Sequence, residues 1–159
     1  MRLRNIKGAD EKILASEFVV QNPVEYKDNW KACFQNDKPL HIEIGMGKGQ
    51  FLYALAKENP DINYIGIERY SSVLLRAIQK MEEEAVSNLK FICIDAKEIT
   101  DVFGKGEVDK IYLNFSDPWP KDRHAKRRLP SRQFLARYDV ILKKDGFLEF
   151  KTDNRGLFD

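Results

Sequence analysis

A short proline-flanked segment holds the side chains best suited to position a reacting base. It reads Ser116-Asp117-Pro118-Trp119-Pro120-Lys121 and follows an apolar run typical of a buried strand. The two prolines fix the backbone shape and remove two N–H donors. The segment therefore presents a carboxylate, Asp117, beside an aromatic ring, Trp119, which either stacks on a base or packs the loop. A fixed carboxylate can orient a substrate and favour developing positive charge; the plainer alternative is a cap at a strand end.

A glycine-rich turn, Glu43-Ile44-Gly45-Met46-Gly47-Lys48-Gly49, lies earlier in the chain, between an apolar run and an amphipathic stretch. Glycines in such a turn let a ligand approach the backbone closely. The dinucleotide-binding spacing G-x-G-x-x-G would need glycine at position 50, where the chain has Gln50. The spacing therefore disfavours a dehydrogenase, and a plain strand-to-helix turn is the alternative to a cofactor site.

Acidic residues follow the next two apolar runs as well. Glu68 comes about 20 residues after the glycines, where an acid can accept hydrogen bonds from both ribose hydroxyls. Asp95, followed by Ala96, ends the third run, where a carboxylate can accept from an adenine amino group. A single such acid is often only a helix cap. Acids after successive strands favour a nucleotide-type ligand, because parallel sheets bind ligands at the carboxyl ends of their strands.

The segment from Lys121 to Arg128 is strongly basic. It holds five Lys or Arg side chains and His124, although the whole chain has a net charge of only +2. Charge runs are usually solvated surface, but this one adjoins Asp117. Phosphate contacts there would position a polyanionic substrate such as RNA.

The elements expected to position these residues alternate between strands and helices, which predicts an α/β fold with a parallel sheet and helices on both faces. Apolar periodicity predicts strands over 40–44, 64–67, 89–94, 110–115 and 147–151. Helices are expected over 50–59, from an N-cap at Ser71, and around 134–142, with Asp145-Gly146 as a turn. Residues 1–38 are expected to form a basic arm and a short helix, 25–34, packed on the sheet, and residues 39–159 to form the main domain.

Taken together, these motifs resemble the tRNA (guanine-N7-)-methyltransferase family, whose Asp-Pro-Trp-Pro-Lys hallmark stands here intact behind Glu-Ile-Gly-x-Gly-x-Gly. The resemblance implies a Rossmann-like class I fold, S-adenosylmethionine as cofactor and the guanosine of the tRNA variable loop as target. By the same resemblance, Glu43 holds the methionyl amine, Glu68 the ribose and Asp95 the adenine. The expected cofactor pocket is completed by Gly45, Gly47, Ala96 and Asp117, and the expected substrate-binding residues are Lys121, Arg123, His124, Ala125, Lys126, Arg127, Arg128, Leu129 and Asp153, with Asp117 as the catalytic residue.

Members of that family continue through two further strands and a Thr-x-x-Glu element, so the C-terminal strands are expected to be missing from this sequence. Two alternatives stay open: a class I methyltransferase acting on a small molecule or protein, and a non-catalytic RNA-binding protein with a Rossmann-like domain. Cys33 and Cys93 are far apart and histidines are few, which disfavours a zinc site and a disulfide. No membrane span or signal peptide is evident, so a cytoplasmic location is expected; the oligomeric state is left open.

Overall fold

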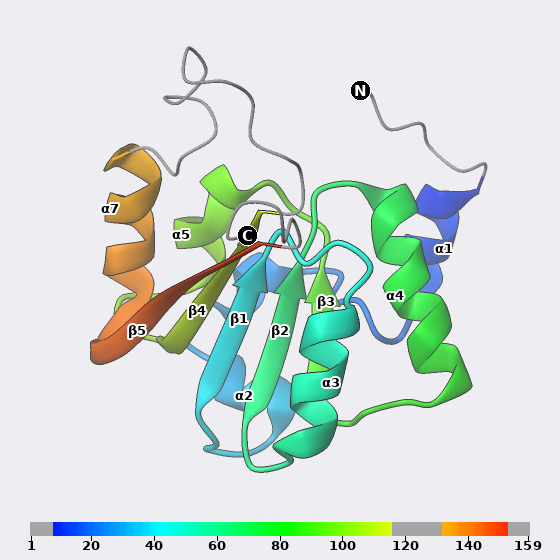
Figure 1. The fold of residues 1–159 in the computed structure, drawn as a ribbon, viewed down its shortest axis with the longest axis horizontal. Coiled ribbons are helices and arrows are strands. Elements are labelled where there is room, and N and C mark those ends of the chain that lie inside the picture. Colours follow the sequence, from blue (N-terminus) through cyan, green and yellow to red (C-terminus); the bar gives the residue numbers. More distant parts are fainter. Residues whose placement is uncertain (1–7, 116–131, 153–159) are drawn as a thin grey trace, which may run out of the picture.

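A computed structural model describes residues 8–115 and 132–152. Their strands form one parallel sheet in the order β3-β2-β1-β4-β5, and the arrows of Figure 1 all point to the same edge. The strands are β1 (Leu40–Ile44), β2 (Asn63–Ile67), β3 (Leu89–Ile92), β4 (Val108–Phe115) and β5 (Leu142–Thr152). The chain builds the sheet outward from β1, first to β3 on one side and then to β5 on the other. Such sheets bind ligands at the carboxyl ends of the strands, at the point where the strand order reverses, which here lies beside β1.

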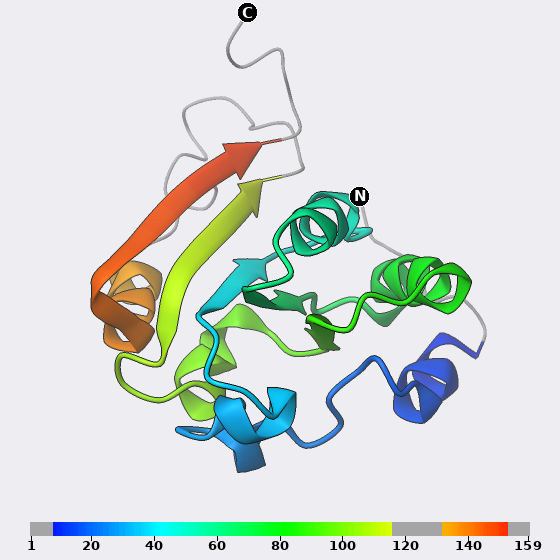
Figure 2. The same ribbon diagram turned by 90° about the horizontal axis from the view of Figure 1, so that it is seen from below.

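Helices cover both faces of this sheet, as Figures 1 and 2 show. Alternate strand residues point to opposite faces, so each face has its own apolar core. One core joins the sheet to α2 (Trp30–Phe34), α5 (Ile99–Val102) and α7 (Arg132–Ile141). The other joins it to α1 (Ala9–Ala15), α3 (Gln50–Glu58) and α4 (Ser71–Glu83). The α/β fold class predicted from the sequence is therefore confirmed.

Hydrogen bonds tie the segment around α2 to α5 and to the loop before β4. The indole N–H of Trp30, 2% exposed, donates to the carbonyl of Val102 at 2.8 Å. The Glu107 carboxylate accepts backbone N–H bonds from Asp28 at 2.9 Å, Trp30 at 3.0 Å and Gly104 at 2.8 Å. One acidic side chain thus fixes the chain immediately before α2 against the loop before β4.

Three local predictions were wrong in detail. The single helix expected over 25–34 is split into a 3-10 helix, η1 (Pro23–Tyr26), and α2, because Asp28 between them has a φ of 65°, which no helix accommodates. Ser71 is not the N-cap but the first residue of α4, and Tyr70 occupies the cap position.

The turn expected at Asp145-Gly146 lies inside β5, which begins directly after α7. Pairing with β4 passes from Val108↔Leu142 to Lys110↔Phe147, so β5 bulges between Leu142 and Phe147. A Cβ on Gly146 would lie 2.8 Å from the carbonyl oxygen of Asp109. The glycine therefore permits the bulge to approach the neighbouring backbone, and it does not mark the end of an element.

Candidate functional site

The glycine turn joins β1 to α3 at the carboxyl edge of the sheet. The N–H groups of Gly45 and Met46 both donate to the carbonyl of Ile67, at 2.9 and 3.1 Å, which ties the turn to the end of β2. Gly49 has a φ of +79°, and a Cβ there would lie 2.9 Å from the Met46 methyl carbon and 3.0 Å from the Ala77 Cβ. Glycine at position 49 is thus required by both backbone and packing.

Gly47 differs from Gly49 in its surroundings. Its φ is +60°, but a Cβ added there would meet no heavy atom within 4 Å among the described residues. Its backbone N–H points toward Glu68, whose Oε1 accepts it at 2.9 Å. The backbone therefore borders open space beside an acidic side chain, as a site for a ligand with hydroxyl donors requires.

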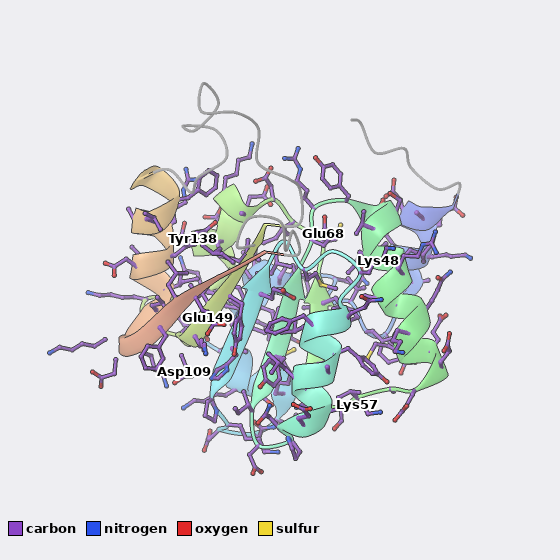
Figure 3. The ribbon with its side chains drawn as sticks, in the orientation of Figure 1. Lys48, Lys57, Glu68, Asp109, Tyr138 and Glu149 are labelled. Atoms are coloured by element: carbon purple, nitrogen blue, oxygen red, sulfur yellow. The ribbon has the colours of Figure 1, made fainter. Side chains whose placement is uncertain are left out.

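Glu68 follows the last residue of β2 and is 7% exposed. Its second oxygen, Oε2, accepts the N–H of Tyr70 at 3.2 Å. Burial raises the pKa of this carboxyl, and the backbone N–H donors from Gly47 and Tyr70 oppose that rise. Figure 3 shows Glu68 at the edge where the strands end, and Asp109 and Lys57 toward the opposite edge. Glu68 is thus placed as an acceptor between the glycine turn and α4.

Asp95 follows β3 and begins the 3-10 helix η2 (Ala96–Glu98). Its Oδ1 accepts the N–H of Lys97 at 3.0 Å, so the capping role considered from the sequence is present. Its Oδ2 lies 3.7 Å from the Arg69 guanidinium and the side chain is 30% exposed. The cap uses Oδ1 and the ion pair uses Oδ2, and each oxygen keeps acceptor capacity at the same edge as Glu68.

Glu43 lies one residue before the end of β1 and is fully buried. It stands opposite Gly66 of β2 and Tyr112 of β4 in the sheet register. Glu43 therefore lies within β1, one residue before the strand ends at the carboxyl edge of the sheet, whereas Glu68 and Asp95 lie beyond the ends of their strands. The three predicted acids come from three adjacent strands, and Gly45, Gly47 and Ala96 adjoin them along the same edge.

Sequence reasoning missed two neighbours of this site. Arg69 lies with its guanidinium carbon 4.9 Å from the centre of the Tyr70 ring, beside Asp95. Tyr138 of α7 is 4% exposed, and burial chiefly raises its pKa to about 12, with the nearby charge of Asp95 contributing. An Arg directly after the strand-end acid was a readable signal. The approach of Tyr138 from α7 was not, because it depends on tertiary packing.

The remaining predicted residues lie outside the described residues: Asp117, Lys121, Arg123, His124, Ala125, Lys126, Arg127, Arg128, Leu129 and Asp153. The strands that lead into them are described. Phe115, the last residue of β4, is paired with Thr152, the last residue of β5. The chain thus enters the segment with Asp117 and the segment with Asp153 from adjacent points on the carboxyl edge.

The described part of the chain lacks two kinds of feature. Residues 8–115 and 132–152 contain no group of three or more His, Cys, Asp or Glu side chains placed to hold a metal ion. The same residues include no helix long and apolar enough to cross a membrane.

Residues 37–159 match the protein family described as "Putative methyltransferase". The tRNA (guanine-N(7)-)-methyltransferase of Lachnoclostridium phytofermentans is 64% identical over 159 residues, which cover 100% of this chain and 74% of that protein. This chain belongs to the tRNA (guanine-N(7)-)-methyltransferase family. The Bacillus subtilis tRNA (guanine-N(7)-)-methyltransferase is 51% identical over 160 residues, again across the whole chain and over 75% of its own length. The family expected from the motifs is thereby confirmed.

Solved structures share the fold at lower identity. An antibiotic-related methyltransferase has a TM-score of 0.63 and 24% identity, covering 83% of this chain and 68% of its own. A 30S ribosomal A1408 methyltransferase from an uncultured bacterium has a TM-score of 0.58 and 24% identity, covering 77% and 58%. At this identity the likeness concerns the fold alone, and it confirms the Rossmann-like methyltransferase architecture of this tRNA (guanine-N(7)-)-methyltransferase family member.

Proposed function

We propose that this protein transfers the methyl group of S-adenosylmethionine to N7 of the variable-loop guanosine of tRNA, in the cytoplasm. One observation carries the proposal: a buried acceptor, Glu68, borders the open space at Gly47 in a chain of this family that keeps the Asp117–Lys121 motif. The names of the relatives specify tRNA and guanine N7 for those proteins, and the basic segment supports an RNA substrate here.

The residues at the carboxyl edge fit the cofactor by their donor and acceptor types. Glu68 accepts from the ribose hydroxyls, and Asp95, beside Ala96, accepts from the adenine amino group. The turn at Gly45 and Gly47 leaves room for the methionyl part, because no side chain fills the space at Gly47. When bound, S-adenosylmethionine supplies a methyl group on a positively charged sulfur. The carboxyl group of Glu43 accepts from the methionyl amine.

Guanine N7 has a free lone pair and carries no proton, so the transfer needs no general base at N7. Methylation instead places positive charge on the purine. Asp117 accepts hydrogen bonds from the guanine N1–H and amino group, which orients the base and favours that charge. Asp153, entering from the end of β5 beside β4, assists in binding the same nucleoside.

The basic residues from Lys121 to Arg128 contact tRNA phosphates, and Ala125 and Leu129 of the same stretch contact the tRNA. These contacts hold the RNA in register but do not select a base. The target guanosine has to leave its stack to reach Asp117, which costs a few kcal/mol. Phosphate contacts close to the transfer site supply part of that free energy.

Methyl transfer from labelled S-adenosylmethionine into unmodified tRNA tests the proposal, with borohydride-aniline cleavage to locate N7-methylguanosine. We expect cleavage at one guanosine of the variable loop. Asp117→Ala should lower turnover by roughly a hundredfold or more, since it removes a preorganised charge at the reacting base. Asp37→Ala is the matched control, because the Asp37 side chain is 90% exposed and its ion pair with Lys31 is long, at 3.9 Å. Cleavage at another position, absence of N7-methylguanosine, or full activity of Asp117→Ala would overturn the proposal.

The salt dependence of tRNA binding tests the basic segment separately. Replacing Lys126, Arg127 and Arg128 together by Gln should reduce the slope of log affinity against log salt by about 2 to 3, since the slope changes by close to one unit for each phosphate that the protein neutralises. An unchanged slope would show that these side chains lie away from the phosphates. Replacing the exposed Lys80 of α4 by Gln is the control and should leave the slope as it is.

A further inference from the structure

Arg69 occupies a distinctive position between two of the acids of the site. It directly follows Glu68 at the end of β2, and its Nη1 lies 3.7 Å from Oδ2 of Asp95 beyond β3. Its guanidinium carbon lies 4.9 Å from the ring centre of Tyr70. The side chain is 59% exposed, and one charge and one aromatic face hold it at the carboxyl edge of the sheet.

This contact restricts the carboxylate of Asp95. Oδ1 accepts the N–H of Lys97 at 3.0 Å, and Oδ2 faces Arg69. With both oxygens engaged, rotation of the carboxylate would break one of the two interactions. A carboxylate has about four acceptor sites, so acceptor capacity remains on both oxygens, at a fixed orientation on the edge shared with Glu68.

We infer that Arg69 is a positioning residue that orients Asp95 toward the adenine amino group and thereby sharpens the selection of an adenine cofactor. The inference rests on the proposed cofactor role of Asp95. An amino group donates to the held carboxylate, whereas a carbonyl oxygen at the same place would face it with a second acceptor. A carbonyl ligand is rejected only as long as the Asp95 carboxylate cannot rotate away from the repulsion between the two acceptors. The ion pair with Arg69 opposes that rotation.

The size of the effect follows from exposure. An ion pair as exposed as this one contributes at most a factor of about five to an equilibrium. Arg69→Ala should therefore raise the KM for S-adenosylmethionine about threefold to fivefold, with kcat at saturating cofactor and the KM for tRNA unchanged. Arg69→Lys keeps the charge and should recover part of the loss. The exposed Arg76 of α4 provides the control substitution, Arg76→Ala.

The deciding measurement is calorimetric binding of S-adenosylhomocysteine and of S-inosylhomocysteine, which carries a carbonyl in place of the adenine amino group. We expect the preference for the amino ligand to fall about threefold to fivefold in Arg69→Ala, to fall further in Asp95→Ala, and to be no lower in the double variant than in Asp95→Ala. Increasing salt should shrink the difference between wild type and Arg69→Ala.

The failures of the two ideas can be told apart. A preference that Asp95→Ala leaves intact would refute the proposed role of Asp95 and this inference with it. A preference lost in Asp95→Ala but intact in Arg69→Ala would refute the positioning role alone. Equal weakening of both ligands in Arg69→Ala would show direct contact of Arg69 with a part of the cofactor that the two share, and would equally overturn the inference.

Discussion

Replacing Gly47 and Gly49 separately by Ala should uncouple cofactor binding from stability. Both glycines have a positive φ, so Ala at either position costs on the order of 1 kcal/mol in backbone strain. At Gly47 the added methyl meets no described atom within 4 Å, and the strain is the whole cost to the fold. At Gly49 it meets the Met46 methyl at 2.9 Å and the Ala77 Cβ at 3.0 Å, which adds about 1–3 kcal/mol of overpacking.

For a chain of this size, each kcal/mol lowers Tm by about 2–4 °C. Thermal unfolding followed by circular dichroism should therefore show a Tm loss of a few degrees for Gly47→Ala and a loss at least twice as large for Gly49→Ala. Calorimetric titration with S-adenosylhomocysteine should show the reverse order of damage for the folded proteins. In Gly47→Ala the methyl enters the space proposed for the methionyl part, and we expect affinity to fall about tenfold to a hundredfold.

Two outcomes would contradict these expectations for Gly47 and Gly49. If Gly47→Ala binds S-adenosylhomocysteine as wild type does, the open space beside Glu68 is not the cofactor pocket. If Gly47→Ala loses as much stability as Gly49→Ala, the two positions do not differ in local packing as described above. Gly106→Ala is a suitable reference, because its φ is +65°, its surroundings are also open and it lies before β4, at the opposite edge.

Three further predictions concern stability. Burial raises the pKa of Tyr138 from 10.0 to about 12, so the folded state holds this proton more tightly than the unfolded state does. Roughly 2 kcal/mol of unfolding free energy, present below pH 10, should therefore be lost between pH 10 and 12. Urea unfolding at a series of pH values should show this loss in wild type and not in Tyr138→Phe. Glu107→Ala removes three backbone hydrogen bonds and should lower the unfolding free energy by about 2–4 kcal/mol, whereas a Tm change under about 2 °C would contradict the tethering described above. The raised pKa of Glu68 means that ionisation of this side chain opposes folding. Wild type should therefore lose unfolding free energy relative to Glu68→Gln as pH rises through the folded-state pKa of Glu68. A difference between the two proteins that does not change with pH, measured by urea unfolding, would count against the burial effect.

Much of the fold could be predicted from local patterns. The strand at Leu40–Ile44 was predicted with its observed bounds, and the helix expected over 50–59 differs by one residue. Such elements are encoded by apolar periodicity, which local sequence displays directly. The bulge around Gly146 was misread as a turn, because its cause is the register against β4 and not the residues themselves.

The features of the site also fall into those that local sequence shows and those that depend on tertiary packing. The positions of Glu68 and Asp95 at the carboxyl edge could be predicted, because an acid directly after an apolar run is a local pattern. The cap that Asp95 forms on η2 is also a local contact, and the sequence offered it as an alternative. The contact of Asp95 with Arg69 could not be predicted, because it depends on how the segments after β2 and β3 meet. Tyr138 gave only an apolar helical position, and its closeness to Asp95 arises from the packing of α7.

The hydrogen bond from the Gly47 N–H to Glu68 has a consequence for how tightly this protein holds its ligands. Two of the roughly four acceptor sites of the carboxylate are taken by the N–H groups of Gly47 and Tyr70. The remaining sites point from a side chain that the backbone already holds in one orientation, so a ribose bound as proposed adds to these hydrogen bonds. A preorganised acceptor of this kind loses little side-chain freedom when its ligand binds.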